Sequence, residues 1–339
     1  MLGTRTLASL LDEQTSVLRT QLTGVFDGHE DAVHDSRVAT RRIRELLALV
    51  PAIPGRDGEA DVATGYREMG RALGKVRDTD VLIALIKSLE VHAPQSAPSL
   101  VLVRQDHEQA RLAKMRRLIK TLEGLDVHAL LHFVGDGHPA GLRTRLTSSG
   151  WRQQIKRLVM ERSHAAGEAI THATGIYFPK RAHRARIAIK QLRYAGEIAV
   201  RTGFGEMGSA LSALKRAQET LGDLHDRQVL SDSLFGYAKD QDVDKEQLKL
   251  TQQVLDAEVM NLHATYLCRR QSLKDACAEI GDAARASHRS RIGVGATLAV
   301  SGFFCATALS GIRQRASERR VAPWPKLSTP IVTDRRRLS

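Results

Sequence analysis

The feature that most constrains this 339-residue chain is a helical pattern that occurs twice. In its first copy, four basic residues follow one another at i, i+3, i+7 and i+10: His34, Arg37, Arg41 and Arg44. At about 100° per residue, this spacing places them within an arc of about 80°. Apolar residues occupy the opposite side of the same helix, at Ala39, Ile43, Leu46 and Val50. The segment therefore predicts an amphipathic helix with one basic face and one buried face.

The second copy has the same spacing, at His183, Arg186, Lys190 and Arg193. A second marker, LGKVRD at 73–78, also returns as LGDLHD at 221–226. The basic pattern that begins at His34 repeats after 149 residues, at His183, and the marker that begins at Leu73 repeats after 148, at Leu221. Two markers repeated in the same order indicate duplication of a unit of roughly 150 residues, and hence two lobes related by an approximate two-fold axis.

The remaining periodicity predicts an all-α fold of two pseudo-symmetric four-helix bundles, in lobes at about 1–134 and 151–290. Only 4% of the residues are aromatic, which favours helix packing over sheets. Helices are expected at about 4–22, 30–50, 61–90, 100–125, 151–174, 179–201, 208–238 and 242–286. The segment GDGHPAG at 135–141 breaks the helical pattern and is interpreted as the linker between the lobes.

The chain beyond residue 290 has a different character. Residues 292–312 carry no charged side chain and are long enough to span a bilayer, although their small residues equally suit a buried or self-associating helix. Residues 313–339 are interpreted as a disordered basic tail. Three cysteines without a paired spacing and an N-terminus without a signal peptide favour a cytoplasmic protein, with membrane anchorage through 292–312 as an addition.

The formal net charge of +13 predicts an anionic partner: nucleic acid, acidic membrane or polyphosphate. Further basic stripes are candidates for the same site: Arg67, Arg71 and Lys75; Arg104, His107, Arg111 and Lys114; and Lys215. In the second lobe, Glu219 and Asp223 stand where the first lobe has bases, so we expect the first lobe to hold phosphate more strongly. Asp78 and Asp226 are expected to orient neighbouring arginines.

The segments HDSRVATRRIREL and HRARIAIKQLRYAGE, followed by LGKVRDTDVL and LGDLHDRQVL, resemble the CHAD domain, the conserved-histidine α-helical domain. The resemblance covers about residues 1–290. It implies two four-helix halves around a basic central cleft that binds inorganic polyphosphate, and association with polyphosphate granules. It also implies that the eight residues of the two basic faces bind polyphosphate. The apolar run and the tail lie outside the family pattern.

Metal-dependent phosphate hydrolysis and nucleic-acid binding are the alternatives to polyphosphate binding. The doublets His34-Asp35 and His225-Asp226 resemble those of metal-dependent phosphohydrolases, but neighbouring arginines such as Arg37 and Arg227 repel a divalent cation. We therefore expect no catalytic residue, no metal and no cofactor. Nucleic-acid binding is the stronger alternative, although the basic faces carry almost no aromatic residues on which bases could stack. The sequence indicates no oligomeric state.

Overall fold

The computed structural model describes residues 6–50, 59–134, 150–175, 177–237 and 243–286, and these ranges contain helices and no strand. The helices are α1 (Leu7–Phe26), α2 (Glu30–Leu47), α3 (Glu59–His92), α4 (Ala97–Gly124), α5 (Val127–Val134), α7 (Gly150–His172), α8 (Pro179–Arg201), α9 (Gly208–Tyr237) and α10 (Lys245–Ala286), with a 3-10 turn η1 (Pro94–Ser96) before α4. The all-α prediction is confirmed. The linker at 135–141, the apolar run at 292–312 and the tail at 313–339 lie outside the described residues.

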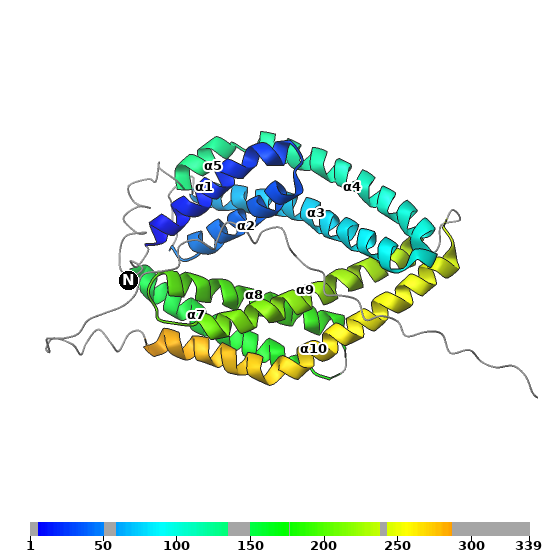
Figure 1. Ribbon diagram of the computed structural model, residues 1–339. Helices are drawn as coiled ribbons and strands as arrows, with labels where there is room; N and C mark the ends of the chain where they lie inside the picture. The colour runs from blue at the N-terminus through cyan, green and yellow to red at the C-terminus, as the bar shows by residue number, and fades with distance from the viewer. Residues whose placement is uncertain (1–5, 51–58, 135–149, 176, 238–242, 287–339) are drawn as a thin grey trace, which may run out of the picture. The chain divides into compact units, whose positions relative to one another are not determined.

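The helices of residues 1–293, which form one unit, pack in two sets. In Figure 1, α1 to α5 gather in one set and α7 to α10 in the other. In the first set α2 packs against α1 and α3, and α3 packs against α4. In the second set each helix packs against the next, and α10 returns to α7, as in a four-helix bundle. The two-fold relation between the sets stays a prediction.

The first set contains a fifth helix, α5, that the sequence analysis did not predict. The side chain of Asp126 begins it by accepting a hydrogen bond from Ala129 N at 2.8 Å, which satisfies one of the free amides of the first turn. Leu130, Leu131 and Val134 bury the inner face of α5 against α1 and α3. The short apolar segment was missed because its eight residues follow closely on the end of α4.

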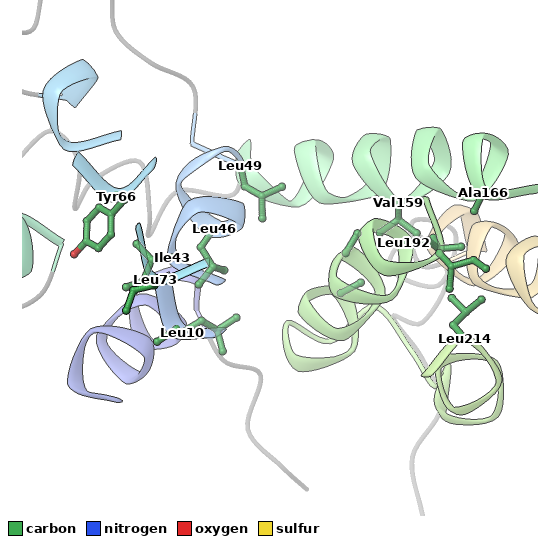
Figure 2. Packing of buried hydrophobic residues seen from close by; sticks show 14 of the residues in the cluster. Leu10, Ile43, Leu46, Leu49, Tyr66, Leu73, Val159, Ala166, Leu192 and Leu214 are labelled. Atoms are coloured by element: carbon green, nitrogen blue, oxygen red, sulfur yellow. The ribbon is translucent and has the colours of Figure 1, made fainter. Parts of the chain in front are cut away.

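The apolar stripes of α2 and α8 enter the core, as their helical spacing predicted. Ile43 and Leu192 are fully buried, and Figure 2 shows them in two groups of apolar side chains. Ile43 packs in one group with Leu10, Leu46 and Leu73, whereas Leu192 lies in the other with its neighbours from α7 and α9. Burial of these stripes leaves each basic face turned away from its own core.

Several side chains connect the two sets. At the start of α4, Ser99 N and Ser99 Oγ both donate to Gln247 Oε1 of α10, at 3.3 and 2.9 Å. Elsewhere in the two sets, Arg162 of α7 pairs with Glu45 of α2 at 2.6 Å, and Arg201 of α8 pairs with Glu13 of α1. The fold thus holds α2 and α8 close together between these points.

The turn between α1 and α2 passes through Gly28, whose φ of 79° is strained for a residue with a side chain. Its carbonyl accepts a hydrogen bond from Arg111 Nη2 of α4 at 2.9 Å. This turn sets the direction in which α2 leaves α1.

No helix in the described ranges has both the length and the apolar character needed to cross a membrane. The membrane-spanning prediction concerns residues that those ranges do not include.

Candidate functional site

The basic faces of α2 and α8 are brought together although they are far apart in the sequence. Arg41 Nη1 of α2 donates a hydrogen bond to Tyr194 Oη of α8 at 2.7 Å, across 153 positions of the chain. The same guanidinium lies 5.7 Å from the centroid of the Tyr194 ring, within the range of a cation–π contact. The two predicted motifs therefore contribute to a single surface.

Four cationic side chains converge on this surface: Arg37, Arg41, Arg186 and Lys190. The pKa of Lys190 is lowered to about 8, mainly by burial and then by the positive charges of Arg41, Arg186 and Arg37, while Glu45 acts in the opposite direction. Burial and then the charge of Arg41 also lower the pKa of Arg37. The fold thus holds like charges close enough to disfavour one another's charged forms.

Glycines in the second repeated marker leave room for two of these guanidiniums. A methyl group on Gly74 of α3 would lie 3.5 Å from Arg37 Nε, and one on Gly222 of α9 would lie 3.8 Å from Arg186 Nε. Each arginine therefore lies close to the backbone of the neighbouring helix, in space that a longer side chain would take. Arg186 Nε is buried and has no hydrogen-bond partner among the described residues.

Two aspartates lie at the same surface, as the sequence predicted for the second marker. Asp78 Oδ1 accepts a hydrogen bond from Arg37 Nη2 at 3.3 Å and remains largely exposed. The pKa of Asp226 is raised to about 6, mainly by burial and also by the charges of Asp223 and Asp78, although Arg186 opposes the shift. Asp78 thus contacts one arginine of the surface, while Asp226 is partly protonated near pH 6.

Two histidine rings of the second lobe pack against each other. The centroids of His183 and His225 lie 4.9 Å apart. Burial lowers the pKa of both imidazoles; the positive charge of Arg186 lowers each pKa further, as does Lys190 for His183. Both rings are therefore largely neutral at pH 7 and can donate an N–H without adding to the repulsion. In the first lobe His34 is half-buried on α2.

Eight other expected site residues divide into two groups. Five are exposed on the surfaces of their helices: Arg44, Arg67, Arg71, Lys75 and Lys215. A methyl group on Gly70 would lie 3.7 Å from Arg44 Nη1, which places Arg44 against α3. These exposed side chains remain available to an anion.

Three expected site residues are instead held by side chains of the protein. Arg104 pairs with Glu90 and Glu108, at 2.7 and 2.9 Å. Arg111 pairs at 2.5 Å with Asp80, whose side chain is 0% exposed. Arg193 pairs with Glu197 and donates to Gln218 Oε1 at 3.0 Å. Their charges are neutralised within the fold, so we assign them structural roles.

Sequence reasoning missed two residues of this surface, Tyr194 and His225. Besides receiving the hydrogen bond from Arg41, Tyr194 has the Arg193 guanidinium 4.5 Å from its ring centroid. It directly follows the basic motif, four residues after Lys190, and this helical spacing could have identified it. His225 lies in the second copy of the LGKVRD marker, at 221–226, where its doublet with Asp226 suggested a metal ligand and not a partner of His183.

Three pairs of repeat counterparts interact across the two helix sets. Arg37 and Arg186 are 149 positions apart, and each contributes to the same field of positive charge. Asp78 and Asp226 are 148 positions apart, and Asp78 helps to raise the pKa of Asp226. Ser99 and Gln247, also 148 apart, are hydrogen-bonded. In these three pairs, positions separated by the length of the repeat thus interact between the two helix sets.

No group of three or more His, Cys, Asp or Glu side chains that could hold a metal ion occurs within the described part of the chain. The surface has the opposite character, because closely spaced cationic donors suit an anion with several phosphate groups.

Comparison with known proteins identifies the family. The sequence model of the CHAD domain matches residues 9–234. The solved CHAD domain from the plant Ricinus communis is similar in fold, with a TM-score of 0.59 at 21% identity over 80% of this chain and 90% of that one. PptA from Streptomyces chartreusis matches with a TM-score of 0.47 at 14% identity, over 81% and 98% of the two chains. A search of curated proteins gave no match. The chain belongs to the CHAD-domain family.

Proposed function

We propose that this protein binds inorganic polyphosphate and does not chemically alter it. The observation that carries the proposal is the convergence of Arg37, Arg41, Arg186 and Lys190, where burial and then the three arginine charges lower the pKa of the lysine to about 8. A polyanion placed among these side chains would relieve their mutual repulsion. Membership in the CHAD family and the net charge of +13 support the same partner.

The dimensions of the helix faces suit a chain of phosphates. Ten residues of helix separate His34 from Arg44 and extend about 15 Å, so several successive phosphates can contact α2. Arginine binds phosphate oxygens with a planar fork, whereas lysine acts as a point charge. Because the ligand has no bases, affinity comes from many such contacts and from the release of counterions.

The first lobe is proposed to bind more strongly than the second. Arg67, Arg71 and Lys75 are exposed on α3, whereas α9 carries Glu219 and Asp223 on the corresponding stripe. The pairing of Arg193 with Glu197 removes a further cation from the second lobe. We also propose a cytoplasmic location, with association at polyphosphate granules or a membrane depending on residues beyond the described helices.

Competition between anions distinguishes polyphosphate binding from nucleic-acid binding. Long polyphosphate is expected to displace a bound oligonucleotide at equal phosphate concentration, and the oligonucleotide is expected to fail to displace polyphosphate. The logarithm of the association constant for polyphosphate should fall linearly with the logarithm of salt concentration. Fluorescence anisotropy with a labelled oligonucleotide measures both effects, and tighter binding of the oligonucleotide would contradict the proposal.

Binding of long polyphosphate is expected to be accompanied by proton uptake near pH 8. The anion raises the pKa of Lys190 above its free value of about 8, so the complex favours the protonated amine. Affinity should therefore be greatest below pH 8 and decrease as the pH rises through that value, with uptake of about half a proton at pH 8. His183 and His225 titrate at lower pH and contribute little there.

Calorimetry in two buffers of different ionisation enthalpy measures this uptake. A Lys190→Gln variant provides the control, because it retains the arginines but lacks the titrating amine. Equal proton uptake by the wild-type protein and this variant would exclude Lys190 from the site.

Hydrolysis of polyphosphate is not expected with Mg²⁺, Mn²⁺ or Zn²⁺, because the surface is rich in cations and poor in carboxylates. Release of phosphate by the purified protein tests this expectation. Turnover that is lost in a His34→Ala variant would show that the protein is an enzyme.

A further inference from the structure

The place of Lys190 on α8 suits its amine to a reaction as well as to binding of an anion. It lies on α8 with Arg186 four residues before it and Tyr194 four residues after it, so all three share one side of the helix. Tyr194 Oη in turn accepts a hydrogen bond from Arg41 Nη1 at 2.7 Å. Lys190 therefore lies between Arg186 and Tyr194 along one side of α8, and Arg41 reaches this side from α2 through its hydrogen bond to Tyr194.

We propose that Lys190 is an acylation site for small acyl phosphates, whose phosphate group is bound by Arg41 and Arg186 while Lys190 Nζ attacks the acyl carbon. The inference goes beyond polyphosphate binding, since it concerns a covalent reaction of the unoccupied surface with a different class of molecule.

The surroundings of Lys190 make its amine a nucleophile near neutral pH. An ordinary lysine, with a pKa near 10.4, is almost entirely protonated at pH 7.5. The pKa of Lys190 is lowered to about 8, so a substantial fraction of its amine carries a free electron pair. Burial and the charges of Arg41, Arg186 and Arg37 cause the shift, and Glu45, which is paired with Arg162, opposes it. Neighbouring cations are an established way of activating a lysine amine.

The arginines supply a site for the leaving group. Arg186 Nε is buried without a hydrogen-bond partner among the described residues, so one donor of this guanidinium is unsatisfied within the fold. A phosphate group accepts charge-assisted hydrogen bonds from such donors. Binding there would hold the acyl carbon near the amine and stabilise the negative charge that the departing phosphate acquires.

The reaction balances without any further component. The lone pair of neutral Lys190 Nζ forms a C–N bond to the acyl carbon. The bond from that carbon to the phosphate oxygen breaks, and its electron pair leaves with inorganic phosphate. The amine loses one proton to solvent, and the product is an Nε-acyl-lysine. The uncharged amide removes one of the four converging cations from the surface.

Labelling of the full-length protein with acetyl phosphate at pH 7.5 tests the proposal. Peptide mass spectrometry over time gives the rate at Lys190 and, in the same sample, at the exposed Lys75, Lys120 and Lys215. Lys190 is expected to react on the order of tenfold faster than these exposed lysines. Polyphosphate is absent from the reaction, so the outcome does not depend on the proposed function.

A second reagent distinguishes binding of the phosphate group by the arginines from the intrinsic reactivity of the Lys190 amine. The N-hydroxysuccinimide ester of acetic acid transfers the same acetyl group but has no phosphate, so the preference for Lys190 should fall by a factor of about three or more. In an Arg186→Gln variant, the rate at Lys190 should decrease more with acetyl phosphate than with the succinimidyl ester, while the rates at Lys120 are unchanged. Either an equal preference with the two reagents or a rate at Lys190 no greater than at the exposed lysines would overturn the proposal.

Discussion

Replacement of Arg37, Arg41 and Arg44 together by Ala is expected to lower the affinity for long polyphosphate about a thousandfold or more at low salt. Each charge-assisted hydrogen bond contributes about 1.5–3 kcal/mol, and three are lost together. Fewer counterions are then released on binding, so the dependence of affinity on salt should also become less steep. Titration at several salt concentrations measures both changes.

Two matched variants show whether position or total charge matters. Replacement of Arg116, Arg117 and Lys120 by Ala removes the same number of charges from exposed positions of α4 and should change affinity far less. Replacement of Arg186, Lys190 and Arg193 by Ala should have an intermediate effect, because Arg193 is already paired with Glu197. All variants must remain helical by circular dichroism. Equal losses for the α2 and α4 variants would show that α2 has no special role in binding.

An Arg111→Ala substitution is expected to destabilise the fold by about 3–5 kcal/mol. It removes the ion pair with Asp80, whose carboxylate is 0% exposed, and leaves that charge buried without its partner. Asp80 Oδ2 already has no hydrogen-bond partner among the described residues, so little else compensates it. The substitution also removes the hydrogen bond to the carbonyl of Gly28 in the turn before α2. Urea unfolding measures the change in the free energy of unfolding.

The Arg104→Ala variant is the control for this effect. Its principal partner, Glu90, has a side chain that is 18% exposed, and Glu108 is more exposed still, so both can be hydrated when the arginine is lost. We expect this change to cost no more than about 1–2 kcal/mol. A double variant, Asp80→Asn with Arg111→Met, should recover part of the stability by removing both charges. If Arg111→Ala leaves stability unchanged but weakens polyphosphate binding, Arg111 is a ligand-binding residue after all.

The helices and the two basic faces could be predicted because both depend on spacing within one segment. The stripes of α2 and α8 needed only the helical period, and the duplicated markers showed that the two segments are related. The same spacing could not show that Arg104 and Arg111 form ion pairs, because it gives no information on the carboxylates of the facing helix. Glu90 and Asp80 approach them only through the packing of α3 against α4.

Contacts between the two helix sets were the part that the sequence could not show. Arg41 donates a hydrogen bond to Tyr194 across 153 positions, and the sequence around these residues does not predict this contact. The pKa of Lys190 is lowered first by burial and then by charges that include those of Arg41 and Arg37 from the other lobe. Such effects depend on how the lobes meet and not on local pattern.

The meeting of repeat counterparts has a consequence for the history of the chain. A gene duplication gives both copies the same residue at each position, so a basic position that meets its own counterpart starts with a like charge opposite it. At Arg71 and Lys75 the two copies have diverged, since the corresponding residues of the second copy are Glu219 and Asp223. At Arg37 and Arg186 both copies are still basic. The pair whose positive charges act on each other across the two helix sets has thus kept a base in both copies.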